Sequence, residues 1–179
     1  MSVVRKWNLT ALWNDDRIER WLEDMARQGL HLEKVSWAGL FTFRRGAPKP
    51  STYRIDIADY RKGLDIDYLQ LMTDAGWRMA AQWSTWYFWR SDAPGTPEIF
   101  TDAPSRAQKY RRMMSLLLLC SLPQLPFMLN AAATLYRSEE LPWLAPGLLP
   151  LAAAAVLFNG YGYLRLRAKL RSLERMQPL

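Results

Sequence analysis

Two long apolar runs in the C-terminal half constrain this chain more than any other feature. Residues 113–136 and residues 141–164 each form a stretch of 24 residues without a formal charge. A bilayer core about 30 Å thick is crossed by about 20 helical residues, so each run is long enough to span it. Four residues, 137–140, separate the runs. The sequence therefore predicts a transmembrane hairpin of two antiparallel helices over residues 113–164.

Basic residues predict how this hairpin is oriented. They lie on the outer flanks of the two runs, with only Arg137 between the runs; the flanking set is Arg106, Lys109, Arg111, Arg112, Arg165, Arg167, Lys169, Arg171 and Arg175. The positive-inside bias then places both termini in the cytoplasm of a multi-pass protein of the cytoplasmic (inner) membrane. Met1 to Leu9 lacks the apolar segment of a signal peptide, so we expect no export of the N-terminal half by that route.

Polar and small residues inside the runs indicate helix contacts. Pro123 and Pro126 should kink the first helix. Side chains that hydrogen-bond or pack closely between helices are expected at Gln124, Asn130, Asn159, Gly160 and Gly162. Because neither run contains a charge, an anchor or an oligomer contact is favoured over a transport path. A homo-oligomer held through the hairpin is one form of such a contact.

The distribution of charge argues against a nucleic-acid partner. The net charge of +7 comes from residues 103–179, which hold 10 Lys and Arg against 3 Asp and Glu. Residues 1–102 hold 14 of each sign and are neutral. A neutral domain lacks the basic surface that binds phosphate backbones. We therefore expect membrane lipid and a protein as partners, and no direct nucleic acid.

The first hundred residues contain an internal repeat. Residues 21–32 align with residues 68–79 at an offset of 47, with aromatic, Leu, Met and Gly residues in the same order. A strand-like segment precedes each block, and a hairpin ending in an aromatic strand follows it. Each unit reads strand, helix, strand, strand, with units at about 1–46 and 51–92. Gly29 and Gly76 stand where a left-handed residue would end each helix.

The repeat predicts the fold and the domain boundaries. The fold class is α+β: duplicated strand-helix-strand-strand units form one antiparallel sheet with two helices on one face. The predicted domains are a cytoplasmic domain (1–102), a basic linker (103–112), the hairpin (113–164) and a basic cytoplasmic tail (165–179). The spacing of Asp16 and Glu19 predicts a capping box at the start of the first helix.

A binding face is predicted from the aromatic strands. Tyr87 and Trp89 align with Phe41 and Phe43, so all four should face the helices. Trp86 and Phe88 then point to the helix-free side of the sheet, together with Leu40 and Thr42 of the first unit. Large rings on that side predict a surface that is covered or that binds an apolar ligand, a lipid surface or a protein.

No pattern of residues predicts catalysis, a metal or a cofactor. His31 is the only histidine and is expected to be an exposed strand residue. Asp65 or Asp67 is expected to cap the second helix. Asp56 is expected to pair with Arg54 or Lys62. A glycine-rich phosphate loop is missing from the sequence. We therefore expect a non-enzymatic protein without a cofactor or a metal.

Several short motifs resemble a known family. The matching segments are 21–22, 25–26 and 29–30 (Trp-Leu, Met-Ala, Gly-Leu), 53–56 (Tyr-Arg-Ile-Asp), 75–77 (Ala-Gly-Trp), 86–88 (Trp-Tyr-Phe) and 98–102 (Glu-Ile-Phe-Thr-Asp). Over most of residues 12–112 the chain resembles the bacterial membrane proteins grouped as domain-of-unknown-function family 2812. The resemblance implies transmembrane helices after this region and a gene next to a PadR-type transcription regulator. It implies no reaction.

Two functions are therefore expected. The first is a membrane-anchored cytoplasmic module for sensing or binding, which regulates a PadR-type regulator or holds an apolar ligand. The alternative is an accessory subunit of a transporter-like membrane complex, held through the hairpin. The two differ in which half of the chain binds the partner.

Overall fold

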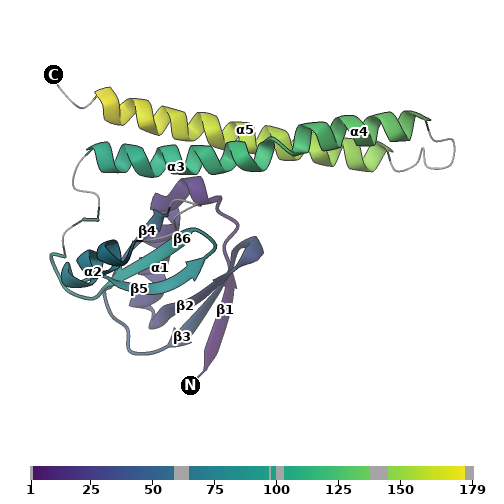
Figure 1. The fold of residues 1–179 in the computed structure, drawn as a ribbon. Coiled ribbons are helices and arrows are strands. Elements are labelled where there is room, and N and C mark those ends of the chain that lie inside the picture. Colours follow the sequence, from purple (N-terminus) through teal and green to yellow (C-terminus); the bar gives the residue numbers. More distant parts are fainter. Residues whose placement is uncertain (1, 59–64, 97, 100–102, 138–144, 176–179) are drawn as a thin grey trace. The chain divides into compact units, whose positions relative to one another are not determined.

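The structure is a computed structural model that describes residues 2–58, 65–96, 98–99, 103–137 and 145–175 (Figure 1). The chain divides into two units, Met1–Ser105 and Arg106–Leu179. This division lies three residues after the predicted boundary. The first unit is a mixed α+β domain, and the second is helical.

The first repeat unit has the predicted order of elements. It consists of β1 (Val3–Trp7), α1 (Asp15–Arg27), β2 (Leu30–Ser36) and β3 (Leu40–Arg45), with two 3-10 turns. Ile18, Leu22 and Met25 recur at helical spacing, and all three are buried. The strands form an antiparallel sheet, here called sheet A, in the order β1-β3-β2.

The second unit repeats this architecture. It consists of β4 (Thr52–Ile57), α2 (Ile66–Asp74), β5 (Arg78–Trp83) and β6 (Trp86–Ser91). Its antiparallel sheet, sheet B, has the matching order β4-β6-β5. Gly29 and Gly76 follow the two helices with φ of +75° and +84°, as predicted. The order of elements therefore confirms that the units are alike.

The two units form two sheets, so the prediction of one sheet with both helices on one face is wrong. Edge strands β2 and β5 lie beside each other, yet each pairs only within its own sheet. Tyr87 and Trp89 face α2, as predicted, and belong to a buried cluster with Met72 of that helix. Phe88 points to the opposite face of sheet B, where its ring contacts Phe41 of sheet A.

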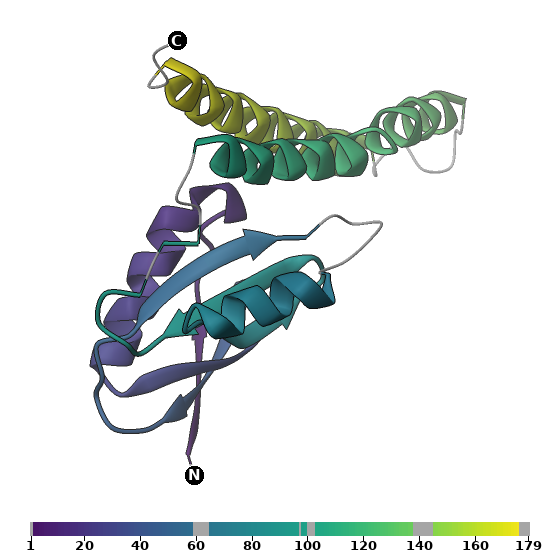
Figure 2. The same ribbon diagram turned by 60° about the vertical axis from the view of Figure 1, so that its left-hand side comes forward.

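Helix α1 therefore lies on a different side of sheet B from α2 (Figure 2). The ring of Trp21 in α1 contacts Phe41 and Phe43 edge to face, with centroids 5.0 and 5.5 Å apart. The same helix runs along β4 of the second unit. The helix face of the first unit thus packs against the helix-free face of the second. This packing between units was not visible in the repeat itself.

The C-terminal part of the chain, after the α+β domain, is a helical hairpin. It consists of α3 (Ala103–Ser121), α4 (Gln124–Arg137) and α5 (Ala145–Arg175). Lys169 of α5 lies 5.3 Å from the ring of Tyr110 in α3, and α5 also lies beside α4. Helix α5 therefore runs antiparallel to α3 and α4. Residues 138–140 of the predicted link and residues 141–144 of the second predicted span lie outside the described residues.

The kink predicted at Pro123 takes the form of a break, whereas the ends of the outer helices differ from prediction. The first helix ends at Ser121 and a new one begins at Gln124, because Pro123 has no N–H to donate and interrupts the ladder. Residues 103–112, predicted as a linker, are the first turns of α3. The predicted basic tail likewise continues α5 as far as Arg175.

Candidate binding surface

The aromatic pair predicted to bind a partner is buried. Phe88 is 0% exposed and Trp86 is 9% exposed. The centroid of the Phe88 ring lies 6.0 Å from that of Phe41. The assumption of an open face was wrong for sheet B, because α1 and sheet A cover it. The prediction that Trp86 and Phe88 point away from α2 was right. Of the two predicted alternatives for that face, a covered surface or a binding surface, the structure has the covered one.

The equivalent face of sheet A is open. Leu40 and Thr42, the other two predicted residues, are half-buried on β3. Leu40 lies directly opposite Trp7 of β1, and Thr42 lies opposite Arg5. The Trp7 side chain is 65% exposed. The sequence analysis missed Trp7, although its place in an edge strand with an alternating pattern was a usable signal.

Basic side chains surround these apolar groups. Lys34 lies opposite Thr42, and Arg44 lies opposite the exposed Val3. Arg44 is paired with Glu33. We call this set the open surface; its members are Val3, Arg5, Trp7, Lys34, Leu40, Thr42 and Arg44. It combines exposed apolar groups with positive charge.

Two further exposed apolar side chains lie near the end of β1. Leu9 is 83% exposed and Trp37 is 78% exposed. The backbone N–H of Asn8 donates to the carbonyl of Gly39 (2.9 Å), which fastens the end of β1 to the turn before β3. A Cβ at Gly39 would lie 2.4 Å from the Asn8 oxygen, and φ is +78°. Only glycine fits that close approach.

In the second repeat unit, α1 covers the corresponding surface of sheet B and the outer edge of β4. The N–H of Ile55 donates to the Glu19 carboxylate (2.8 Å), and the N–H of Tyr53 donates to Glu23 (3.3 Å). Asp56 accepts from the N–H of Ile57 (2.6 Å). Carboxylates therefore satisfy the outer edge of β4. The predicted capping box is not formed: α1 begins at Asp15 without a side-chain cap, and Glu19 reaches β4 instead.

Arg54 joins three carboxylates beside this edge. Its Nη1 lies 3.1 Å from Glu23, and its Nε donates to Glu98 (2.8 Å). The hydrogen bond that Arg54 donates to Glu98 and the charges of Glu19, Glu98 and Glu23 raise the pKa of Arg54 against the effect of burial. Arg54 therefore holds α1 and Glu98 to β4. It does not pair with Asp56, which is buried and accepts a hydrogen bond from the Tyr68 hydroxyl (2.8 Å). Lys62, the other partner predicted for Asp56, lies outside the described residues.

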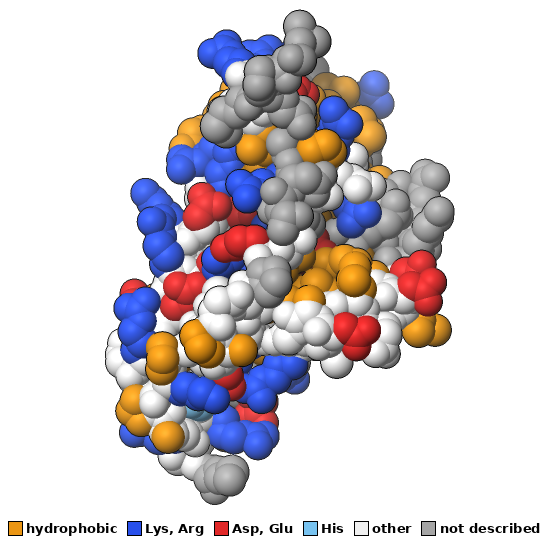
Figure 3. All heavy atoms as spheres, turned by 90° about the vertical axis from the view of Figure 1, so that its left-hand side faces the viewer, with side chains coloured by type: hydrophobic (Ala, Val, Ile, Leu, Met, Phe, Trp, Pro, Cys, Tyr) orange, Lys and Arg blue, Asp and Glu red, His pale blue; other side chains and the backbone are white. Residues whose placement is uncertain are grey.

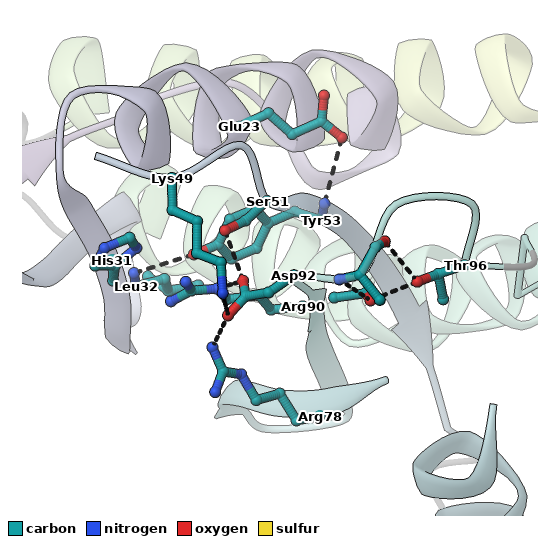
Figure 4. A network of polar contacts seen from close by, with 12 residues as sticks. Glu23, His31, Leu32, Lys49, Ser51, Tyr53, Arg78, Arg90, Asp92 and Thr96 are labelled. Atoms are coloured by element: carbon teal, nitrogen blue, oxygen red, sulfur yellow. Dashed lines mark hydrogen bonds and ion pairs between the residues drawn. The ribbon is translucent and has the colours of Figure 1, made fainter. Parts of the chain in front are cut away.

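Asp92 is the centre of a second polar network (Figure 4). Its carboxylate accepts from the Ser51 hydroxyl (2.7 Å) and from Arg90 Nε (2.6 Å), and it pairs with Lys49 and Arg78. Burial alone would raise the pKa of Asp92. The hydrogen bonds from Ser51 and Arg90 and the nearby guanidinium charges instead lower this pKa to about 2. The carboxylate stays ionised and holds the segment between the repeat units to β5 and β6.

Two other polar residues of the α+β domain, His31 and Asp65, make hydrogen bonds that stabilise the fold. His31 is half-buried on β2, and its Nε2 lies 2.9 Å from the Ala47 carbonyl. Asp65 accepts from the N–H of Asp67 at the start of α2, so the predicted cap is confirmed. Within the described ranges, no group of three His, Cys, Asp or Glu side chains is placed to hold a metal ion.

The predicted contact residues of the hairpin are spread over α4 and α5. Gln124 begins α4, and its Oε1 is buried without a partner in the described part of the chain. Asn130 is exposed on the same helix, and Asn159 is half-buried on α5. Gly162 is buried, whereas a Cβ at Gly160 would meet nothing within 4 Å. Gly160 therefore makes no close packing with the described residues of the hairpin.

The predicted basic flanks lie together at one end of the hairpin (Figure 3, top). The first turns of α3 carry Arg106, Lys109, Arg111 and Arg112, and the last turns of α5 carry Arg165, Arg167, Lys169 and Arg171. Arg111 lies 3.7 Å from Glu174. One helical stretch, Pro104–Asn130, is long and apolar enough to cross a membrane by length and composition.

Comparison with known proteins identifies a family. The sequence profile described as "Protein of unknown function (DUF2812)" matches residues 14–122. This match confirms the resemblance drawn from the motifs. No curated protein and no solved structure matches the chain.

Proposed function

The chain belongs to the DUF2812 family of proteins of unknown function, and on that premise we propose that it is a non-enzymatic binding module anchored in a membrane. The helical hairpin is the anchor and crosses the bilayer twice. The α+β unit lies in the cytoplasm and recruits a protein partner through the open surface. Both termini are cytoplasmic.

Three features of the helical unit support the anchor. The stretch Pro104–Asn130 has the length and hydropathy of a membrane span. Helix α5 is 31 residues long and returns antiparallel to it, so it has the length to cross as well. The basic residues gather where α3 begins and α5 ends, which is the arrangement of a cytoplasmic membrane boundary.

The exposure of Trp7 is the observation that carries the binding function. A tryptophan that is 65% exposed on a helix-free sheet face, opposite Leu40 and on the same face as Val3, leaves apolar area in water. The matching face of the second unit buries Ile55, Ile57 and Phe88 completely. The fold thus covers this face in one unit and leaves it available in the other. Aromatic and Arg side chains are the groups enriched at protein interfaces.

A protein partner accounts for the open surface better than a small apolar ligand does. The apolar groups of the surface are interleaved with Arg5, Lys34 and Arg44, which favour a charged partner. A PadR-type regulator, suggested by the family resemblance, is the first partner to test.

The experiment compares partners captured by full-length variants from native membranes. Trp7→Ala should lose the partner that the wild-type protein retains, while its thermal midpoint stays within about 2 °C because the ring is mostly exposed. Leu71→Ala is the matched control, since Leu71 is also an exposed apolar side chain but lies on α2. Phe88→Ala marks the covered face and should cost about 3 kcal/mol of folding free energy.

Unchanged capture by Trp7→Ala would contradict the proposal. A partner that is retained by the hairpin alone would favour the accessory-subunit function. Equal loss of capture by Leu71→Ala would show that the effect is not specific to the open surface.

A further inference from the structure

We infer that the partner contributes an amphipathic helix with two carboxylates four residues apart, and that this helix lies along the edge of β1. The inference rests on the proposed function, because it names what the open surface receives. It follows from comparing the two repeat units of the same chain.

The outer edge of β1 is open. The N–H of Arg45 donates to the carbonyl of Ser2, and the N–H of Asn8 donates to Gly39, so even-numbered residues of β1 face β3. Antiparallel pairing alternates these directions, so the N–H and C=O groups of Val3, Arg5 and Trp7 point outward. In the described part of the domain, β4 is capped by carboxylates and β2 lies beside β5. Among the strands that the structure describes, β1 alone has an outer edge that lies beside no other strand and receives no carboxylate.

The chain itself shows how a helix caps such an edge. Glu19 and Glu23 are four residues apart, which is a rise of about 6 Å along a helix. The N–H groups of Tyr53 and Ile55, two residues apart on a strand, are separated by about 6.6 Å. The two spacings match, so consecutive carboxylates meet consecutive outward N–H groups. Strand edges left unpaired are otherwise prone to nonspecific pairing.

The two edges are equivalent by register. Val4 pairs with Phe43 in sheet A, and Arg54 pairs with Trp89 in sheet B. Val3, Arg5 and Trp7 therefore take the places of Tyr53, Ile55 and Ile57. The first edge is exposed and the second is filled by α1. Because Arg5 stands where Ile55 does, a carboxylate at this edge of β1 also meets a guanidinium.

Two other occupants fit the surface less well. In a second copy, α2 carries Ile66 and Gln70 at the positions that Glu19 and Glu23 occupy in α1, and its two carboxylates, Asp67 and Asp74, are seven residues apart rather than four. An antiparallel pair of β1 strands centred on Arg5 would place two guanidinium groups opposite each other, which is unfavourable. An acidic helix of a different protein avoids both problems.

The experiment uses a probe taken from the chain itself. A labelled peptide of residues 14–28, stapled as a helix on its solvent side, is titrated into the full-length protein in nanodiscs. We expect saturable binding by fluorescence anisotropy. Replacing both glutamates of the peptide by Gln should weaken binding at least about tenfold. Arg5→Glu in the protein should weaken it as much, whereas Arg20→Glu, an exposed site on α1, should not.

The outcomes separate this inference from the proposed function. If the Gln peptide binds as tightly as the unchanged peptide, or if the stapled peptide does not bind at all, the inference that an acidic helix occupies the edge of β1 is wrong. Stronger binding of a proline-containing extended peptide with the same acidic composition would show strand addition instead. Binding of anionic vesicles alone, lost with Trp7→Ala, would show a lipid surface. If Trp7→Ala still releases the native partner while the peptide fails, the proposed function stands and only this inference falls.

Discussion

Three cations and one hydroxyl converge on Asp92 at the end of β6. Lys49 and Ser51 come from the segment that joins the two repeat units, and Arg78 begins β5. Asp92→Asn removes the charge that these groups share but keeps the size of the side chain. We expect a loss of about 1.5 kcal/mol at pH 6, a value reduced for the partial exposure of the network.

The pH dependence of this loss has a definite sign. The pKa of Asp92 is lowered to about 2 from an ordinary value of 3.8, so its stabilising effect is complete above pH 3.8. The effect disappears as pH falls from 3.8 toward 2. Thermal midpoints of wild type and Asp92→Asn should therefore differ at pH 6 and converge near pH 2. A constant difference at both pH values would mean that the charge network is not the cause.

At the scale of elements, α1 has two tasks, because it covers sheet A and also caps β4. Glu19→Met keeps the length of the side chain but removes the acceptor for the Ile55 N–H. An unsatisfied buried N–H costs about 1–3 kcal/mol, so we expect a loss in that range. Glu19→Gln keeps an acceptor oxygen and should lose less.

Amide exchange gives the site-specific measurement for this prediction. The Ile55 amide should exchange faster in Glu19→Met, while the Arg54 amide, which faces β6, should change less. If the Ile55 amide exchanges at the same rate in the wild-type protein and in Glu19→Met, Glu19 does not cap the outer edge of β4.

Local sequence patterns predicted the helices and strands well, but they did not predict which elements pack against each other. The glycine stops, the Asp65 cap and the order of strands follow from residues close together in the sequence. The same local logic assigned Glu19 to a capping box, although its partner lies 36 residues away on β4. Spacing within a helix does not reveal which strand runs beside that helix.

At the scale of the whole domain, the missing information was how two similar units pack together. The alternation that placed Trp86 and Phe88 opposite Tyr87 and Trp89 was correct. Whether that face is open depends on the neighbouring unit, and a repeat alignment treats the two units as equal. The helix face of the first unit packs against the helix-free face of the second. The helix-free face of sheet B is therefore covered, and that of sheet A is exposed. The candidate surface therefore lies on sheet A rather than on sheet B, and the binding role predicted for Trp86 is proposed for Trp7 instead.

The orientation of the helical unit is the prediction that decides whether the domain works in the cytoplasm. Reporter fusions at Met1 and Leu179 should both report the cytoplasm, and a reporter inserted directly after Arg137 should report the outside. The physical reason is that nine basic residues flank the start of α3 and the end of α5, against Arg137 alone at the turn. Replacing Arg111, Arg112, Arg165 and Arg167 by Gln should weaken this bias and produce mixed orientations. Replacing Arg17 and Arg20 on α1 is the matched control, because those residues lie far from the runs in sequence. A cytoplasmic signal after Arg137 would show that the hairpin does not cross the membrane, because this position in the chain reaches the far side only if both helices span the bilayer.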